Sequence, residues 1–368
     1  MKHSSKSDER NATVVQLLNR LFDEISNENY IADSDIEQSI DILFRTTIWG
    51  FREVVLVVAI ARLIEPSYCA SEDFYACNPR TLFEKPIKQV LDSKGIPSRQ
   101  SGPLNVAKGT PRLNTQWAAG RKPRFVAEEV VQLVAKIEQI SPQDLENFTK
   151  LLLRRFIAEA LQVRKSMLFV DPKSDLDLLF RLTKSFIENT PDQGNTPQRI
   201  IGYLLESYHD QLASNVTVHG HTDHASTTST TSKKLGDITE ESNGVMLLVY
   251  EVTVKGFGEQ RIREAYASIL QYAANSGLEA KEIIVLCREQ DVHPDVVPVT
   301  SLYLGKLEYE GVVFYFLDIY EWIIAQLFRM SMASRRDFFD KLQSYVADKN
   351  TSEKLRYAWK AMFREDSA

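Results

Sequence analysis

Two acidic residues lie in neighbouring segments that have the composition of β-strands. Asp237 lies in the first segment, and Glu251 lies in the second, Val245 to Lys255, which is rich in β-branched residues. Alternate side chains of a strand share a face, so Glu251, Thr253 and Lys255 should point the same way, and a hairpin would bring Asp237 beside them. Two carboxylates can hold Mg²⁺ with its waters, and a lysine can orient the attacking water in phosphodiester hydrolysis.

The two acids also have a simpler interpretation, as a turn aspartate and a strand-edge glutamate that discourages aggregation. A glutamate inside the strongly apolar segment 245–254 is nevertheless costly to bury without a partner. A bound metal ion would be such a partner, so this acidic pair is the leading candidate for a catalytic site.

The elements around the pair alternate between helix and strand. Helices are predicted from Thr196 and over 259–274, and strands over 235–239, 245–255, 283–286 and 312–317. The earlier part of the chain has apolar residues at helical spacing. We expect an α/β (α+β) fold in two domains: residues 1–190, mainly helical, and residues 195–368, with a central mixed sheet flanked by helices.

This order of elements, together with the acids, resembles the PD-(D/E)XK nuclease superfamily and its restriction-endonuclease-like core. In that likeness Gly236-Asp237 stands where the family has Pro-Asp, and Glu251 is the second acid, so both would bind Mg²⁺. The superfamily often adds an acid from the helix before the first strand. Glu206 occupies that place, unless it is simply a solvated helix residue.

The lysine of the resemblance is displaced in this sequence. The family places it two residues after the second acid, where Thr253 stands here. The resemblance assigns its role to Lys255, with Thr253 lining the site, or to Lys233 or Lys234 in the preceding loop, as in rearranged members. The displacement also leaves open a DNA-binding protein with a degenerate core that does not cleave.

Short segments of both halves look like the SacI family of type II restriction endonucleases. They are residues 80–84, 101–108, 117–121 and 229–237. The resemblance implies a restriction endonuclease that cuts double-stranded DNA at a specific sequence, with a cognate DNA methyltransferase acting on the same site. A symmetric site needs two equivalent active sites, so a homodimer is expected, with residues 1–190 serving recognition and dimerisation.

A basic island interrupts the acidic background of the chain, which has a net charge of -6. Between Arg80 and Arg124 there are ten Lys or Arg and two acids, in a stretch rich in Gly and Pro. Such charges usually coat a surface, but here the excess favours DNA contacts. The expected DNA-binding residues of the island are Lys108, Arg112, Arg121 and Arg124, with Asn105, Asn114 and Gln116 as further candidates for base reading.

A polar tract, Asn215 to Lys234, is predicted as a loop before Asp237. Its run of hydroxyl residues is typical of a flexible linker, but hydroxyls and lysines also contact phosphates. The expected DNA contacts of the tract are Thr230, Thr231, Ser232, Lys233, Lys234 and His221.

The same tract contains the pattern H-x-H-x-D-H at residues 219–224, which is the metal-binding signature of metallo-β-lactamase-type hydrolases. That fold needs a buried strand before the motif and further histidines downstream, and only His293 follows. A zinc-dependent hydrolase is therefore kept as an alternative to the nuclease.

Composition excludes several classes of protein. With 43% hydrophobic and 26% charged residues, the 368-residue chain should form a compact core. Its longest apolar run, Val54 to Ala61, is far shorter than a membrane-spanning helix, and its first ten residues lack the apolar stretch of a secretory signal. Three scattered cysteines fit a reducing compartment. We expect a cytoplasmic, prokaryotic protein with no membrane partner.

Overall fold

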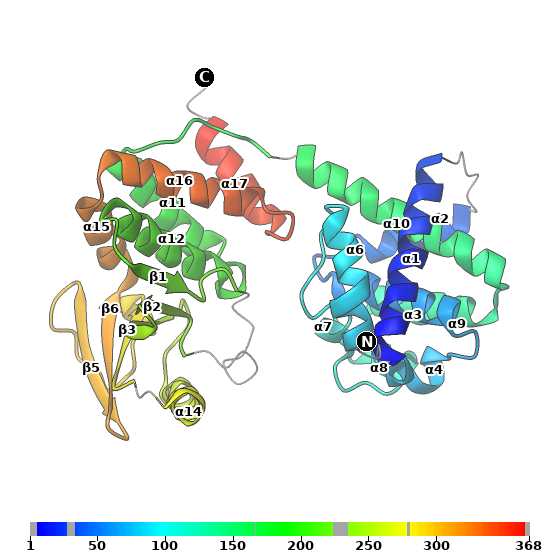
Figure 1. The fold of residues 1–368 in the computed structure, drawn as a ribbon, viewed down its shortest axis with the longest axis horizontal. Helices are drawn as coiled ribbons and strands as arrows, with labels where there is room; N and C mark the ends of the chain where they lie inside the picture. Colours follow the sequence, from blue (N-terminus) through cyan, green and yellow to red (C-terminus); the bar gives the residue numbers. More distant parts are fainter. Residues whose placement is uncertain (1–5, 28–33, 166, 224–234, 278–279, 365–368) are drawn as a thin grey trace. The chain divides into compact units, whose positions relative to one another are not determined.

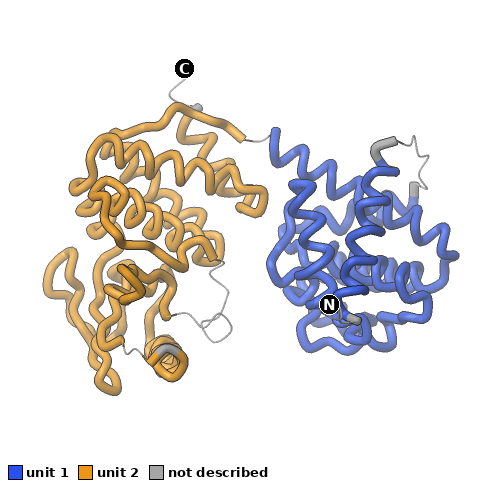
Figure 2. Tube along the Cα trace, in the orientation of Figure 1, with its two compact units in different colours: residues 1–166 blue, residues 167–368 orange. Residues whose placement is uncertain are grey.

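The computed structural model describes residues 6–27, 34–165, 167–223, 235–277 and 280–364. These residues form two compact units, residues 1–166 and 167–368 (Figure 2). The sequence predicts the boundary between the two domains at residues 190–195. The structure places it at Ser166, because the apolar residues of the next helix, Leu176–Asn189, join the core of the second unit.

The regular secondary structure of the described residues of unit 1 is entirely helical. Its central helix α3, Gly50–Ile64, is buried over residues 50–61, mostly apolar apart from Arg52 and Glu53, and α9 and α10 pack against it. The other α-helices are α1 (Lys6–Asn27), α2 (Ser34–Leu43), α4 (Ala70–Asp73), α5 (Pro79–Leu82), α6 (Lys88–Ser93), α7 (Leu104–Ala107), α8 (Thr115–Ala119), α9 (Arg124–Gln139) and α10 (Pro142–Lys165).

Unit 2 surrounds a mixed sheet with the strand order β1-β2-β3-β4-β6-β5. Strands β1, β2 and β3 are antiparallel neighbours, β3, β4 and β6 run parallel, and β5 pairs antiparallel with β6. The strands are β1 (Val216–His219), β2 (Ile238–Ser242), β3 (Val245–Val252), β4 (Glu282–Cys287), β5 (Tyr303–Tyr309) and β6 (Val312–Asp318). The expected mixed α+β class is therefore confirmed.

Helices cover both faces of this sheet (Figure 1). Tyr250 and Val252 of β3 point into the core formed with five helices, whereas Val249 points toward α14 on the other face. By strand alternation, Glu251 shares the α14 face with Val249. The helices are α11 (Leu176–Asn189), α12 (Asn195–Gln211), α14 (Glu259–Ser276), α15 (Ile319–Arg329), α16 (Met332–Ala347) and α17 (Glu353–Arg364).

Two strands were not predicted from the sequence. β1 lies inside the tract that the sequence predicts as a loop. The strand is hard to recognise because it has only four residues and one buried side chain, Val218. β5 lies at the other edge and contains Gly305 and Lys306, which weaken its strand pattern. Within the described ranges, no helix is long and apolar enough to cross a membrane.

Candidate functional site

Asp237 is fixed at the start of β2 by the strand beside it. Its backbone N–H donates to the carbonyl of Tyr250 at 2.9 Å, and its Oδ2 accepts from the N–H of Val252 at 2.9 Å. Gly236 precedes it with a φ of +68°, and a Cβ there would lie 2.7 Å from Val249 Cγ1. Glycine is therefore required where the resembling family has proline, because any side chain would collide with β3.

Glu251 lies beside Asp237, one residue before the end of β3. Its side chain is 13% exposed and faces α14, and its parallel neighbour on β4 is Val285. Burial raises the pKa of Glu251, and the negative charge of Asp237 raises it further. Burial also raises the pKa of Asp237, although the hydrogen bond from the Val252 N–H lowers it. The structure thus brings the two predicted acids together in a site that disfavours their charges.

Arg261 supplies positive charge at this pair. It lies in the first turn of α14, and its Nη2 is 3.5 Å from Glu251 Oε2. Its charge lowers the pKa of both acids, opposing the effect of burial. Sequence reasoning missed Arg261, because nothing in the local pattern distinguishes it from a solvated arginine at a helix start.

Lys255 does not share the strand face on which its predicted role rested. β3 ends at Val252, and the Thr253 hydroxyl accepts from the Lys255 N–H at 3.1 Å and donates to the Lys255 carbonyl at 3.0 Å. The chain bends there, and the Lys255 residue is exposed. The alternation of a strand therefore stops before Lys255. The alternative lysines, Lys233 and Lys234, lie outside the described residues.

Glu206 takes part in a different cluster from Asp237. It lies on α12, as expected, but its oxygens contact His221 Nε2 at 3.1 Å and Lys341 Nζ at 3.8 Å. The same lysine also pairs with Asp210 of α12 and, within α16, with Asp337. The role of Glu206 as a third acid stays a prediction, and its printed contacts connect α12 to α16 and to the loop after β1.

Gln198 is the α12 residue that contacts Asp237, and sequence reasoning missed it. Its Nε2 donates to the carbonyl of Gly220 at 2.8 Å and to that of Asp237 at 3.4 Å. Among the described residues nothing donates to its buried Oε1. The one sequence feature that could have indicated Gln198 is its position in the first turn of the helix that precedes β1 and β2.

The H-x-H-x-D-H pattern does not form a metal site in the described part of the chain. His219 is half exposed and lies 3.9 Å from Glu241, whereas His221 is buried against Gly202 and Tyr203 of α12. The last histidine of the pattern, His224, lies outside the described residues. Over the described ranges, no group of three or more His, Cys, Asp and Glu side chains converges as metal ligands do.

Part of the basic island, residues 109–121, lines a hollow of about 630 Å³ in unit 1. Its lining includes Thr110, Arg112, Asn114, Gln116 and Arg121. The guanidinium of Arg112 contacts the carbonyl of Glu72, and that of Arg121 contacts Thr110 Oγ1 at 3.2 Å. These contacts leave both positive charges uncompensated by a carboxylate within the described residues.

Other residues of the island have more ordinary roles. Arg124 pairs with Glu128 at 2.7 Å within α9. Arg80 pairs at 2.9 Å with Glu84, which likewise lies four residues further along the chain. Asn114 caps α8 by accepting from the N–H of Trp117. Asn105 lies within α7 and Lys108 follows it, and both residues are exposed. The predicted contacts Thr230, Thr231 and Ser232 lie outside the described residues.

A buried glutamate supports the loop that carries this island. Glu53 of α3 is fully buried and accepts from the Arg99 N–H at 2.8 Å. Burial raises the pKa of Glu53 to about 7, although the Arg99 hydrogen bond and the nearby positive charges lower it. This residue links the stability of unit 1 to pH.

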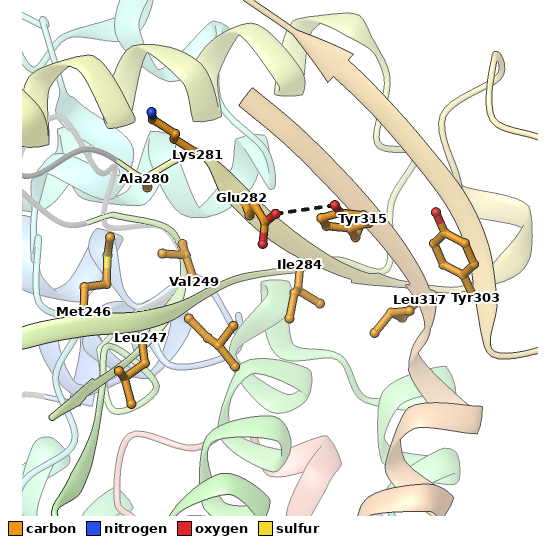
Figure 3. A pocket seen from close by; sticks show the side chains of 11 residues that line it. Met246, Leu247, Val249, Ala280, Lys281, Glu282, Ile284, Tyr303, Tyr315 and Leu317 are labelled. Atoms are coloured by element: carbon orange, nitrogen blue, oxygen red, sulfur yellow. Dashed lines mark hydrogen bonds between the residues drawn. The ribbon is translucent and has the colours of Figure 1, made fainter. Parts of the chain in front are cut away.

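A second hollow, of about 540 Å³, lies in unit 2. It is lined by strands β3, β4, β5 and β6 and is mostly apolar, with Met246, Leu248 and Ile284 in its walls (Figure 3). Its acidic lining residue, Glu282, lies 3.5 Å from the hydroxyl of Tyr315. Lys281, Tyr303 and Tyr315 are its other polar lining residues, and Glu282 is its one carboxylate.

Comparison with known proteins adds no constraint to these assignments. No protein-family model matches the chain, and no curated protein matches its sequence.

Proposed function

We propose that the chain is a Mg²⁺-dependent endonuclease that hydrolyses double-stranded DNA at a specific sequence, as type II restriction endonucleases do. The observation that carries the proposal is the pairing of Asp237 and Glu251 on hydrogen-bonded strands. Both lie in surroundings that raise the pKa of each carboxyl group, and Arg261 lies beside them. Perturbed acids with a specific charged partner are typical of functional sites.

The two carboxylates fit a magnesium ion. Mg²⁺ takes oxygen ligands, usually one or two carboxylates with several waters, and Asp237 and Glu251 supply two. A divalent cation would also relieve the repulsion from Asp237, which together with burial raises the pKa of Glu251. When bound, it would neutralise charge on the phosphodiester and make a bound water more acidic. The two side chains would hold the ion, and the strands fix where it sits.

The arrangement of the elements is consistent with the proposal. Helix α12 precedes three antiparallel strands, and α14 then leads to β4, which runs parallel to β3. The order α12, β2, β3, α14, β4 supports the resemblance to the PD-(D/E)XK superfamily, and β1 is an additional edge strand. The acids lie at the start of β2 and near the end of β3, so the hairpin between them sets their separation.

Unit 1 is the proposed DNA-recognition unit. Residues 1–166 carry 23 Lys or Arg against 21 Asp or Glu, whereas residues 167–368 carry 21 against 29. Arg112 and Arg121 place uncompensated charge in a hollow that also presents the amides of Asn114 and Gln116. Arginine favours guanine and phosphate, and amides pair with adenine, so this hollow fits the edge of duplex DNA.

The remaining parts of the proposal follow from the reaction. Cutting both strands at a symmetric site calls for two active sites, and so for a homodimer. A host that makes such an enzyme must protect its own DNA, which calls for a methyltransferase that modifies the same sequence, in the cytoplasm of a prokaryote.

Cleavage of plasmid and viral DNA with Mg²⁺ or with EDTA tests the proposal, beside the variants Asp237→Asn and Glu251→Gln. We expect discrete fragments that require Mg²⁺ and that neither variant produces. Glu241→Gln is the matched control, because Glu241 is a half-exposed acid on β2 outside the pair. Intact DNA across divalent metals and salt concentrations would exclude the catalytic role.

A DNA-binding protein without cleavage is the second candidate, favoured by the exposed position of Lys255 outside β3. It predicts tight, salt-dependent binding of duplex DNA that leaves the DNA intact. Binding and cleavage measured on the same preparation therefore distinguish the two functions, and a zinc content near zero would set aside the zinc hydrolase.

A further inference from the structure

The acidic pair in unit 2 has a cationic neighbour whose function the sequence did not indicate. We propose that Arg261 binds the phosphate at the cleavage site and supplies the positive charge that was expected from a lysine. This inference rests on the proposed nuclease function and assigns a residue to it. It is based on three contacts of Arg261 and on the position of Lys255.

Arg261 is held in place by two neighbours besides Glu251. Its Nη1 donates to Thr253 Oγ1 at 2.7 Å, and its guanidinium carbon lies 5.1 Å from the centre of the buried Phe257 ring. A cation over an aromatic ring is attracted to its face, and the ring also limits the directions the guanidinium can take. Arg261 is thus oriented before any substrate binds.

Thr253 uses its entire hydrogen-bonding capacity in this arrangement. Its hydroxyl donates to the Lys255 carbonyl, accepts from the Lys255 N–H and accepts from Arg261. A hydroxyl has one donor and two acceptor positions, so no position remains for a substrate. Thr253 is therefore a positioning residue that anchors Arg261, which revises its predicted role of lining the site.

The guanidinium still has donors to offer. Its contacts with Thr253 and Glu251 engage two of five N–H groups, and 34% of the side chain is exposed. A phosphodiester carries its charge on two non-bridging oxygens, which a planar guanidinium can contact in parallel. Arg261 therefore combines a fixed position beside the metal-binding carboxylates with an open edge of the right chemistry.

The chemistry assigns Arg261 one role and excludes another. In hydrolysis a water oxygen bonds to phosphorus, the bond to one ester oxygen breaks, the water gives a proton to solvent and the leaving oxygen takes one up. A guanidinium stays protonated, so Arg261 cannot accept the proton of the water. It can neutralise the negative charge that grows on the phosphate in the transition state.

The test is single-turnover cleavage by Arg261→Gln, Arg261→Lys and Lys255→Gln, with Arg263→Gln as the matched control. Arg263 lies on the same helix, is mostly exposed and pairs with Glu259, so its loss reports only on surface charge. We expect Arg261→Gln to slow cleavage about 100-fold or more, as the loss of one transition-state donor does, and Arg261→Lys to retain part of the rate. Lys255→Gln and Arg263→Gln should stay within about threefold of wild type.

Chemical rescue separates charge at the site from mere structure. In Arg261→Ala, millimolar guanidinium should restore part of the cleavage rate, while DNA binding with Ca²⁺ in place of Mg²⁺ stays near the wild-type value. Normal cleavage by Arg261→Gln, or no rescue of Arg261→Ala while DNA binding is kept, would overturn the inference and leave the nuclease intact. A wild-type chain that never cuts DNA would instead refute the proposed function, and this inference with it.

Discussion

Replacing Glu251 by glutamine should stabilise unit 2 at neutral pH while abolishing cleavage. Burial and Asp237 raise the pKa of Glu251 in the folded chain, so the folded state disfavours its ionised form. An acid with a raised pKa contributes stability that is present below its unfolded pKa and is lost as pH rises toward the folded value. Glutamine has the same shape and no charge, so the variant does not incur this loss.

The magnitude follows from the linkage between proton binding and folding. Each pH unit over which Glu251 titrates costs the wild-type chain about 1.4 kcal/mol, so between about pH 5.5 and about pH 7.5 the variant should gain up to about 2.7 kcal/mol relative to wild type. The lost ion pair with Arg261 opposes this gain, but an arginine that is 34% exposed contributes about 1 kcal/mol or less. Burial of the charge and repulsion by Asp237 together outweigh this ion pair, so the variant is the more stable chain.

Urea unfolding in EDTA at the two pH values measures the effect, followed by the fluorescence of Trp322 and Trp359. A background without Trp49 and Trp117 confines the signal to unit 2, because those two tryptophans lie in unit 1. Titrating groups that do not interact with Glu251 cancel in the difference between the two chains, so the difference reports on Glu251 and its neighbour Asp237. A variant that is less stable at both pH values, or whose stability follows pH as wild type does, would refute the reasoning.

Three further predictions concern other parts of the chain. Gly220→Ala should cost on the order of 2 kcal/mol in urea unfolding and reduce cleavage, because the residue has a φ of +92° and a Cβ would lie 2.3 Å from the carbonyl oxygen of Asp237. Arg121→Ala should weaken DNA binding and lower its salt slope by about 1 in a titration of fluorescence anisotropy, with a smaller effect from Arg124→Ala, whose charge is paired. Glu53→Gln should remove a loss of up to about 3.4 kcal/mol that wild-type unit 1 shows in urea unfolding as pH rises from about 4.5 to about 7.

The acidic pair could be predicted from sequence because its positions are local. The apolar, β-branched segment before Glu251 indicates a strand. Gly236, directly before Asp237, is typical of a turn that leads into the first of the two strands. A hairpin then brings the two acids together without any information from distant residues. The apolar residues at helical spacing in the earlier part of the chain likewise predict its helices, as in α9 and α10.

The rest of the site depends on contacts between distant elements. β3 ends at Val252 because the Thr253 hydroxyl bonds both backbone groups of Lys255, an option that strand alternation ignores. Arg261 and Gln198 reach the pair from two helices, and the sequence around each is typical of any amphipathic helix. Such residues become recognisable only when the packing of the helices on the sheet is known.

The most direct test of the central claim is sequencing of the DNA ends that the purified protein leaves in the presence of Mg²⁺. We expect every end to carry one common sequence, and we expect no ends from Asp237→Asn, which removes a metal-binding carboxylate without changing its shape. Ends at random sequences, or ends that persist in Asp237→Asn, would contradict a sequence-specific nuclease whose active site is the pair Asp237 and Glu251.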